Sequence, residues 1–239
     1  AIGFQALANQ NFTTATDSHN TAVGYNAGVS VTTGDANTII GSLAGDALTT
    51  GVVNTALGYL ALSSATNSKT NTAIGAQALL NFNNTSTVVA DNTAVGYNAG
   101  SGLTTGLLNT LIGATAGDAL TTGEKNVAVG KDALTGGTTY DGNTAIGWQA
   151  LKVADNTSGS DGNNVAIGAD AASAVTSGLR NVLIGVSCAA TLRTGGGNVM
   201  LGQGTDVSAA AAENQITIGQ SIACDQDSQV TIGKASNVV

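Results

Sequence analysis

Asn71-Thr72-Ala73-Ile74-Gly75 is the stretch that decides the fold, because close copies of it recur along the whole chain. Asn143-Thr144-Ala145-Ile146-Gly147 repeats it unchanged, and its final glycine occurs fourteen times. Successive glycines are 21, 17, 17 and 17 residues apart, three times over, and the last interval is 14. The chain is thus a short unit of mostly 17 residues nested in a 72-residue block. The glycines are Gly3, Gly24, Gly41, Gly58, Gly75, Gly96, Gly113, Gly130, Gly147, Gly168, Gly185, Gly202, Gly219 and Gly233.

A unit of 17 residues is too short to hold a β-strand, a crossover helix and a second strand, and it cannot bury an apolar face alone. Stacked units solve both problems, because each strand pairs with the same strand of the next unit. We therefore predict an all-β parallel solenoid of about 14 turns, forming a single domain over residues 1–239. The sequence begins inside a copy of the repeat, so we expect a segment of a longer fibre chain.

The composition excludes several other classes of protein. The 239 residues include 33 Gly and no Pro, but the glycines lack the three-residue period of collagen. With 42% hydrophobic and only 9% charged residues, the chain does not resemble a disordered protein. The net charge of −8 without a basic cluster argues against nucleic acid, and no run of 18 apolar residues predicts a membrane span.

Positions are counted here from the repeat glycine, which is position 0. Position −1 is Ile, Val or Leu in all fourteen copies, and we expect it to point inward. Position −3 is Thr or a β-branched aliphatic residue and lies on the same strand face by period-two alternation. Position −2, which is Ala in eight copies, should then point outward. An outward row this apolar predicts that other chains cover it.

Two further columns suggest structural roles. Asparagine at position −4 can form a ladder of side-chain amides at the 4.7–4.9 Å strand spacing, and the repeat glycine marks a bend where a Cβ is not tolerated. Ala27, Ala44 and other small residues at position +3 fit a narrow interior, and Thr-Thr-Gly makes the return turn. The ladder asparagines are Asn20, Asn37, Asn54, Asn71, Asn92, Asn109, Asn126, Asn143, Asn164, Asn181 and Asn198, with Gln215 and Gln229 in the last two copies.

The phrase Asn-Thr-Ala-Ile-Gly, followed by two variable residues and a small one, resembles the head repeat of trimeric autotransporter adhesins and related repeats of bacteriophage tail fibres. The last copy, residues 229–236, matches best, whereas the 17- and 21-residue spacings and the 72-residue block depart from the family pattern. The resemblance implies a left-handed parallel β-roll in a homotrimeric fibre. It also implies an extracellular place on a virion or bacterial surface, and attachment to a host glycan or protein receptor.

Catalytic chemistry finds no support in the sequence, and we expect no enzyme, cofactor or metal site. His19 is the single histidine and has no counterpart at Asp91 or Asn163 in the other blocks, so a triad has no base. Asp46 and Asp118 are equivalent but lie in no calcium-loop motif, which predicts solvated turn residues. Cys188 and Cys224 should lie about two strand spacings apart, beyond disulfide reach.

Three functional hypotheses remain at this point. A structural and adhesive fibre would use the three long loops Ala8–His19, Leu80–Asp91 and Lys152–Asn163 for recognition, because they differ while their scaffold does not. An ice-binding solenoid would use the stacked threonines at 21, 38, 55, 72, 93, 110 and 144. A fibre-borne polysaccharide hydrolase would need a carboxylate pair, which the repeat does not supply.

Overall fold

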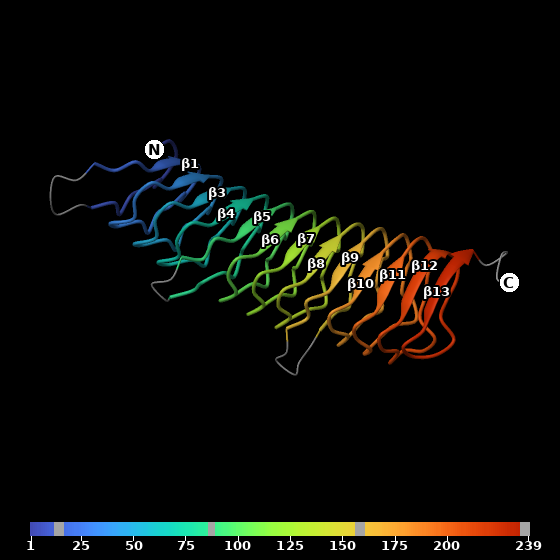
Figure 1. The fold of residues 1–239 in the computed structure, drawn as a ribbon. Helices are drawn as coiled ribbons and strands as arrows, with labels where there is room; N and C mark the ends of the chain where they lie inside the picture. The colour runs from blue at the N-terminus through green and yellow to red at the C-terminus, as the bar shows by residue number, and fades with distance from the viewer. Residues whose placement is uncertain (12–16, 86–88, 156–160, 235–239) are drawn as a thin grey trace. The chain divides into compact units, whose positions relative to one another are not determined.

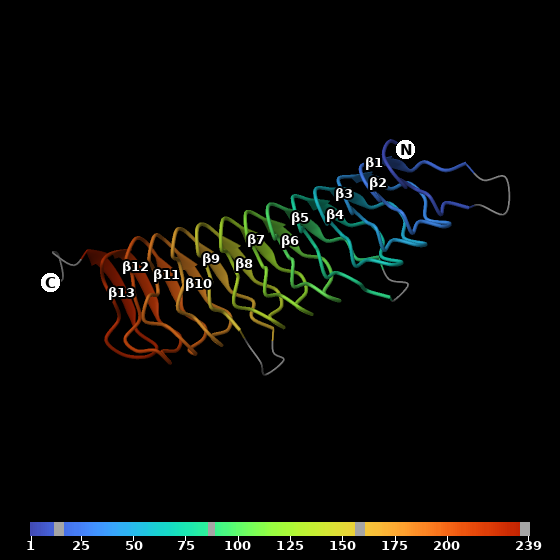
Figure 2. The same ribbon diagram turned by 180° about the vertical axis from the view of Figure 1, so that it is seen from behind.

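The computed structural model describes residues 1–11, 17–85, 89–155 and 161–234, and these form an all-β parallel solenoid without helices (Figure 1). The chain divides into two compact units, Ala1–Thr122 (unit 1) and Gly123–Val239 (unit 2). In each unit the strands lie along one edge of the turns and the irregular return segments along the opposite edge (Figures 1 and 2). The predicted fold class is therefore confirmed.

The described residues of unit 1 form six strands of three residues, each paired in parallel with the next, and Ile2 makes a single bridge to Val23. Residues at equivalent positions of the repeat pair with each other, since Thr21 pairs with Thr38 and Thr38 pairs with Thr55. The strands are β1 (Thr21–Val23), β2 (Thr38–Ile40), β3 (Thr55–Leu57), β4 (Thr72–Ile74), β5 (Thr93–Val95) and β6 (Thr110–Ile112).

The described residues of unit 2 form seven strands, the last two of which are five residues long. Pairing is again parallel and in register with the repeat, as in Val165 opposite Val182. The strands are β7 (Val127–Val129), β8 (Thr144–Ile146), β9 (Val165–Ile167), β10 (Val182–Ile184), β11 (Val199–Leu201), β12 (Ile216–Gln220) and β13 (Val230–Lys234).

The strand face that points inward is the opposite of the one predicted. Position −2 is completely buried, as Ala56 and Ile39 show, whereas positions −1 and −3 point outward and are half-buried or exposed. Because side chains alternate along a strand, choosing the wrong face for one position inverts all three. The prediction that position −1 lines the interior, and that the alanine row faces a neighbouring chain, is therefore wrong.

Size matching across the narrow interior explains this choice of face. Ile39 at position −2 packs over glycines at position +4, and its Cδ1 lies 2.8 Å from where a Cβ on Gly28 would stand. Several turns with alanine at position −2 instead carry leucine at position +4, as in the buried pair Ala56 and Leu62. Gly100, in the turn of Ala94, is covered from the next turn, because Leu111 Cδ1 lies 2.7 Å from where its Cβ would stand. Small and large residues thus alternate across the core, and a larger residue at both positions would overfill it.

The repeat glycines stack on one another and have no room for a side chain. Gly24 has φ of +136°, and a Cβ there would lie 2.5 Å from the carbonyl oxygen of Gly41. Within unit 1 and within unit 2 the same approach recurs from turn to turn, for example between Gly168 and Gly185. Glycine is required at this position by both its dihedral angle and the close backbone contact.

One turn of unit 2 fills its core differently. Gly137 stands at position +7, where neighbouring turns carry apolar residues such as Leu120 and Val175, and Tyr140 stands at position +10, where they carry glycine. The Tyr140 ring is fully buried, its hydroxyl donates a hydrogen bond to the Gly178 carbonyl, and it accepts one from Asn164 Nδ2 at 3.0 Å. Burial raises the pKa of Tyr140 to about 12. The tyrosine at position +10 thus fills the space that an apolar side chain at position +7 fills in other turns.

Candidate functional site

The asparagines at position −4 form a hydrogen-bonded column inside the turns. Asn54 donates its backbone N–H to Asn37 Oδ1 at 2.9 Å and its Nδ2 to the same oxygen at 3.1 Å. The same Nδ2 also donates to the Ser68 carbonyl in the return turn at 2.8 Å. Asn20 is half-buried, and the ten asparagines from Asn37 to Asn198 are buried. Each amide joins its own turn to the turns on both sides, which is a structural role.

The column continues past the long turns and changes near the end. Asn71 and Asn143, which precede long turns, donate Nδ2 to the Lys69 and Asp141 carbonyls of their own turns at 3.0 Å. Gln215 continues the column by donating its backbone N–H to Asn198 Oδ1 at 3.0 Å. Its longer side chain exchanges hydrogen bonds with Ser208 and also donates Nε2 to Asp227 Oδ1 in the next turn at 3.2 Å.

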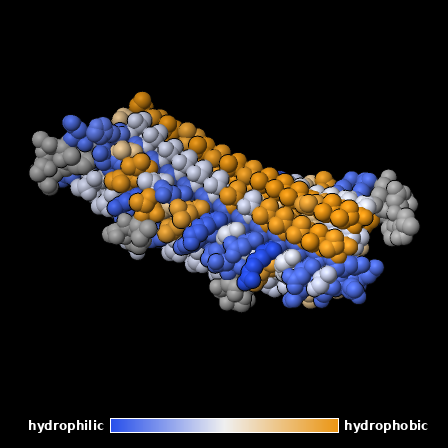
Figure 3. Space-filling view, in the orientation of Figure 1, coloured by the Kyte–Doolittle hydropathy of each residue, from blue (hydrophilic) through white to orange (hydrophobic). Residues whose placement is uncertain are grey.

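The outward strand face is the main surface that the repeat builds. Positions −1 and −3 form two parallel rows, with each side chain one strand spacing from the next. In unit 2 both rows are apolar except at Thr144, and Ile184 remains 36% exposed between its two neighbours in the row. Figure 3 shows this face as a broad orange band over the strands of unit 2. A parallel sheet with an uncovered apolar face is unusual, because such sheets are normally covered on both sides.

Unit 1 presents a mixed version of the same face. Its −1 row is aliphatic, from Val23 to Ile112, whereas its −3 row is threonine in all six strands. Thr38, Thr55 and Thr72 stand opposite one another in register, so their side chains form a straight row. Figure 3 shows the paler threonine row beside the orange aliphatic row.

The titratable residues singled out in the sequence do not come together. His19 is exposed, its Nδ1 lies 3.3 Å from Asp35 Oδ1, and its backbone N–H donates to the same oxygen at 2.7 Å. This backbone hydrogen bond is the main reason that the pKa of Asp35 is lowered. Asp46 is half-buried rather than fully solvated, and its Oδ1 accepts no hydrogen bond. Desolvation raises the pKa of Asp46.

The two cysteines are free and buried, as the spacing argument predicted. Burial raises the pKa of the Cys188 thiol to about 11, which keeps it protonated and unreactive at neutral pH. Cys224 lies 3.4 Å from Thr217 Oγ1, measured from its Sγ. Within the described ranges, no three His, Cys, Asp or Glu side chains are grouped to hold a metal ion, and no helix is long and apolar enough to cross a bilayer.

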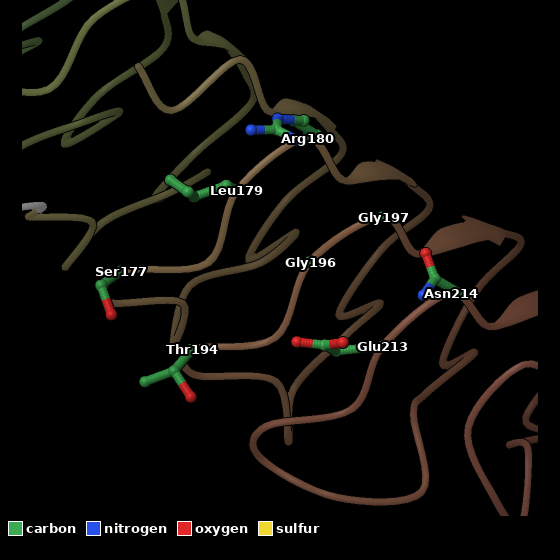
Figure 4. Close-up of a pocket in the computed structure, with 8 residues that line it drawn as sticks. All are labelled: Ser177, Leu179, Arg180, Thr194, Gly196, Gly197, Glu213 and Asn214. Carbon is green, nitrogen blue, oxygen red and sulfur yellow. The ribbon is translucent and has the colours of Figure 1, made fainter. Parts of the chain in front are cut away.

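A polar hollow of about 300 Å³ opens on the return turns of unit 2 (Figure 4). It forms because Gly196 and Gly197 carry no side chains where the adjacent turns carry Leu179 and Arg180 on one side and Glu213 and Asn214 on the other. Arg180 and Glu213 lie on opposite sides of the Gly196–Gly197 segment, and both are exposed. The hollow offers two opposite charges and two hydroxyl groups to solvent.

The three loops proposed for recognition lie partly outside the described residues, which omit 12–16, 86–88 and 156–160. The signal that sequence reasoning missed is the size matching between positions −2 and +4, which identifies the inward row without coordinates. Comparisons of the sequence with known protein families and with curated proteins find no match. The similarity to adhesin heads and tail fibres therefore rests on the motif alone.

Proposed function

We propose that this chain is a structural segment of an extracellular homotrimeric fibre, on a virion or a bacterial cell surface, that supports attachment to a host or surface. The solenoid fold is compatible with this role, since the stacked turns, the buried asparagine column and the glycine column give each unit a regular, hydrogen-bonded frame. The role requires no catalysis or cofactor.

The observation that carries the proposal is the outward apolar strand face, not the alanine row on which the sequence argument relied. Two aliphatic rows, one interrupted at Thr144, run along unit 2, and one aliphatic row runs along unit 1. Copies placed around an axis parallel to the stack bury the same row at the same height, turn after turn. Association driven by this burial leaves the return turns and long loops free for a receptor. The number three rests on the resemblance to trimeric adhesin heads.

Light scattering on the purified chain tests the assembly. We expect a three-chain mass, and we expect Ile184→Glu to lower it, because a carboxylate on this face would be buried without a partner. Val153→Glu is the matched control, since Val153 is an exposed apolar residue (42%) outside the strand rows. A folded, monomeric wild-type chain would overturn the trimer.

The threonine row of unit 1 favours a second candidate, binding to ice. Thr38, Thr55 and Thr72 point outward from a regular strand face beside an aliphatic row. An ice-binding surface needs such a flat, evenly spaced array of threonine side chains. A trimer would bury this face, so the two functions exclude each other. Thermal hysteresis from a monomeric chain, lost in Thr55→Lys, would support ice binding, and its absence would remove that candidate.

A further inference from the structure

The exposed aromatic side chains of the described residues occupy one position of the turn. Among the described residues, Phe82 and Tyr140 are buried, and each of the others follows a repeat glycine directly, at position +1. Phe4, Tyr25, Tyr59 and Tyr97 lie in unit 1, and Trp148 lies in unit 2. The tyrosines are 52–57% exposed. The four rings of unit 1 share one position of the turn and form a row rather than scattered surface residues.

The tyrosines of unit 1 occupy every second turn. Tyr25, Tyr59 and Tyr97 are separated by turns that carry the small residues Ser42 and Ala76 at the same position. Two strand spacings separate successive rings by about 9.5 Å. Rings one turn apart cover each other, since Phe4 stacks on Tyr25 with centroids 5.6 Å apart and planes 9° apart. The two-turn interval leaves ring surface open beside Ser42 and Ala76.

The surroundings of this row are uncharged. In unit 1 no charged residue occurs at positions −3, −1, +1 or +2. The tyrosines themselves place hydroxyl groups along the row, whereas Asn26 and Asn98, which follow two of the rings, have their Oδ1 atoms buried. An uncharged row of rings that carry hydroxyl groups matches a neutral ligand with both apolar faces and hydroxyl groups. Anionic polymers find no cation along this row.

We propose that the row of Tyr25, Tyr59 and Tyr97 binds an extended, uncharged β-1,4-linked glycan chain. The C–H faces of pyranose rings pack on aromatic rings, and the disaccharide repeat of such a chain is close to the two-turn interval, so every second sugar meets a tyrosine. The proposal rests on the attachment function above and names its ligand class, but it uses residues beyond the glycine bend and not the strand rows.

Isothermal titration calorimetry with cellohexaose is the direct test. We expect Tyr59→Ala to weaken binding roughly five- to tenfold and the triple variant Tyr25→Ala/Tyr59→Ala/Tyr97→Ala to abolish it. Trp148→Ala is the matched control and should leave affinity unchanged, because this ring stands alone in its row between Lys131 and Ala169. Binding that survives the triple variant, or no binding by the wild type, would overturn the proposal.

The spacing can be tested separately from the number of rings. Tyr59→Ala/Ser42→Tyr keeps three tyrosines but moves the middle ring by one turn, and we expect the same loss as in Tyr59→Ala alone. Maltohexaose, which has the same sugars in a coiled α-linked chain, should bind at least tenfold more weakly. Equal binding of both oligosaccharides, or full affinity of the shifted variant, would show that spacing does not matter.

Light scattering on the same variants separates this proposal from the trimer. Loss of glycan binding with an unchanged mass and circular dichroism spectrum would support a binding row. A change of mass in the triple tyrosine variant would assign the rings to the chain–chain interface and overturn the glycan proposal. Ile184→Glu should have the opposite profile, with an altered mass and retained cellohexaose binding.

Discussion

Unit 1 and unit 2 are built from the same turn, yet their outward strand faces differ. At position −3 unit 1 carries threonine in every strand, whereas unit 2 carries Val or Ile in all strands but β8. The inward position shows no such division, because it is alanine or a larger apolar residue in most turns of both units, with the larger residue recurring at Ile39, Leu111 and Leu183. The two units therefore share one core and differ in the surface that another molecule or water must cover.

The difference between the faces is chemical rather than geometric. Threonine and valine have nearly the same shape, so the exchange replaces one methyl group by a hydroxyl and leaves the strand unchanged. Burying a hydroxyl without a partner costs about 1–3 kcal/mol, whereas burying a methyl group is favourable. We infer that association through unit 2 is stronger per turn than through unit 1, and the predictions below are arranged around this contrast.

The largest effect should come from the glycine column, and it should be equal in both units. Gly58→Ala and Gly168→Ala would each place a Cβ 2.5 or 2.6 Å from a carbonyl oxygen of the next turn, at φ of +139° or +133°. We expect each to cost about 3 kcal/mol or more of unfolding free energy, measured by urea denaturation.

Gly197→Ala is the control for this pair. Its φ is +71°, the new Cβ would meet only the Asn214 side chain, and the neighbouring turns carry Arg180 and Asn214 at the same position. We expect a cost below about 1 kcal/mol. A similar loss for Gly197→Ala would show that any glycine change in this fold is harmful and that the column is not special.

A charge placed on the strand face should distinguish the units. Val182→Glu in unit 2 and Thr55→Glu in unit 1 occupy the same position −3. On the proposed trimer, we expect Val182→Glu to weaken assembly at least tenfold more than Thr55→Glu, because it removes apolar burial in addition to introducing a carboxylate. Sedimentation at several concentrations measures both. Equal effects would contradict the stronger association assigned to unit 2.

Exchanging the two side chains gives a smaller and more specific effect. The triple variant Val165→Thr/Val182→Thr/Val199→Thr gives unit 2 the face of unit 1, and Thr38→Val/Thr55→Val/Thr72→Val does the reverse. We expect assembly to weaken in the first and strengthen in the second, by about 1 kcal/mol per exchanged residue at most. Unchanged assembly in both would show that the −3 row lies outside the interface.

The same contrast shows what sequence could predict. The glycine interval and the asparagine at position −4 determine the fold class and register, because both columns need their residue type in nearly every turn. The direction of the strand faces could not be read from hydrophobicity, since positions −1 and −2 are both apolar and alternation alone does not say which is inside. Ile39 facing glycine and Ala56 facing Leu62 carry that information, but only when positions on opposite walls are compared.

The candidate surfaces were less predictable for a related reason. The rows at −1 and +1 become surfaces only once the inward position is known, so the exposed aliphatic face and the tyrosine row both depended on a choice that the sequence leaves open. The Tyr140 ring, which fills the core space left by Gly137, is a second feature that the sequence did not predict. It requires knowing that positions +7 and +10 of one turn share a core site.

The smallest predicted effect is a difference in acid response. At position +5 two turns of unit 1 carry the equivalent residues Asp46 and Asp118, whereas unit 2 has no acidic residue there and carries Thr135, Lys152, Ser173, Ala190, Val207 and Cys224. Because desolvation raises the pKa of folded Asp46 above its ordinary value of 3.8, protonation favours the folded state. This contribution is fully present below the unfolded pKa and is lost as the pH rises through the raised folded pKa.

Asp46→Asn should therefore stabilise unit 1 at pH 7, and the gain should disappear near pH 3.5. Solvent screens this half-exposed carboxyl, so we expect less than about 0.5 kcal/mol. Urea unfolding of the variant and the wild type at the two pH values measures the difference, and Ser173→Asn at the same position of unit 2 is the control that should show no pH dependence. A variant that is less stable than the wild type at pH 7 would mean that the Asp46 carboxylate makes a favourable contact, and the burial argument would be wrong.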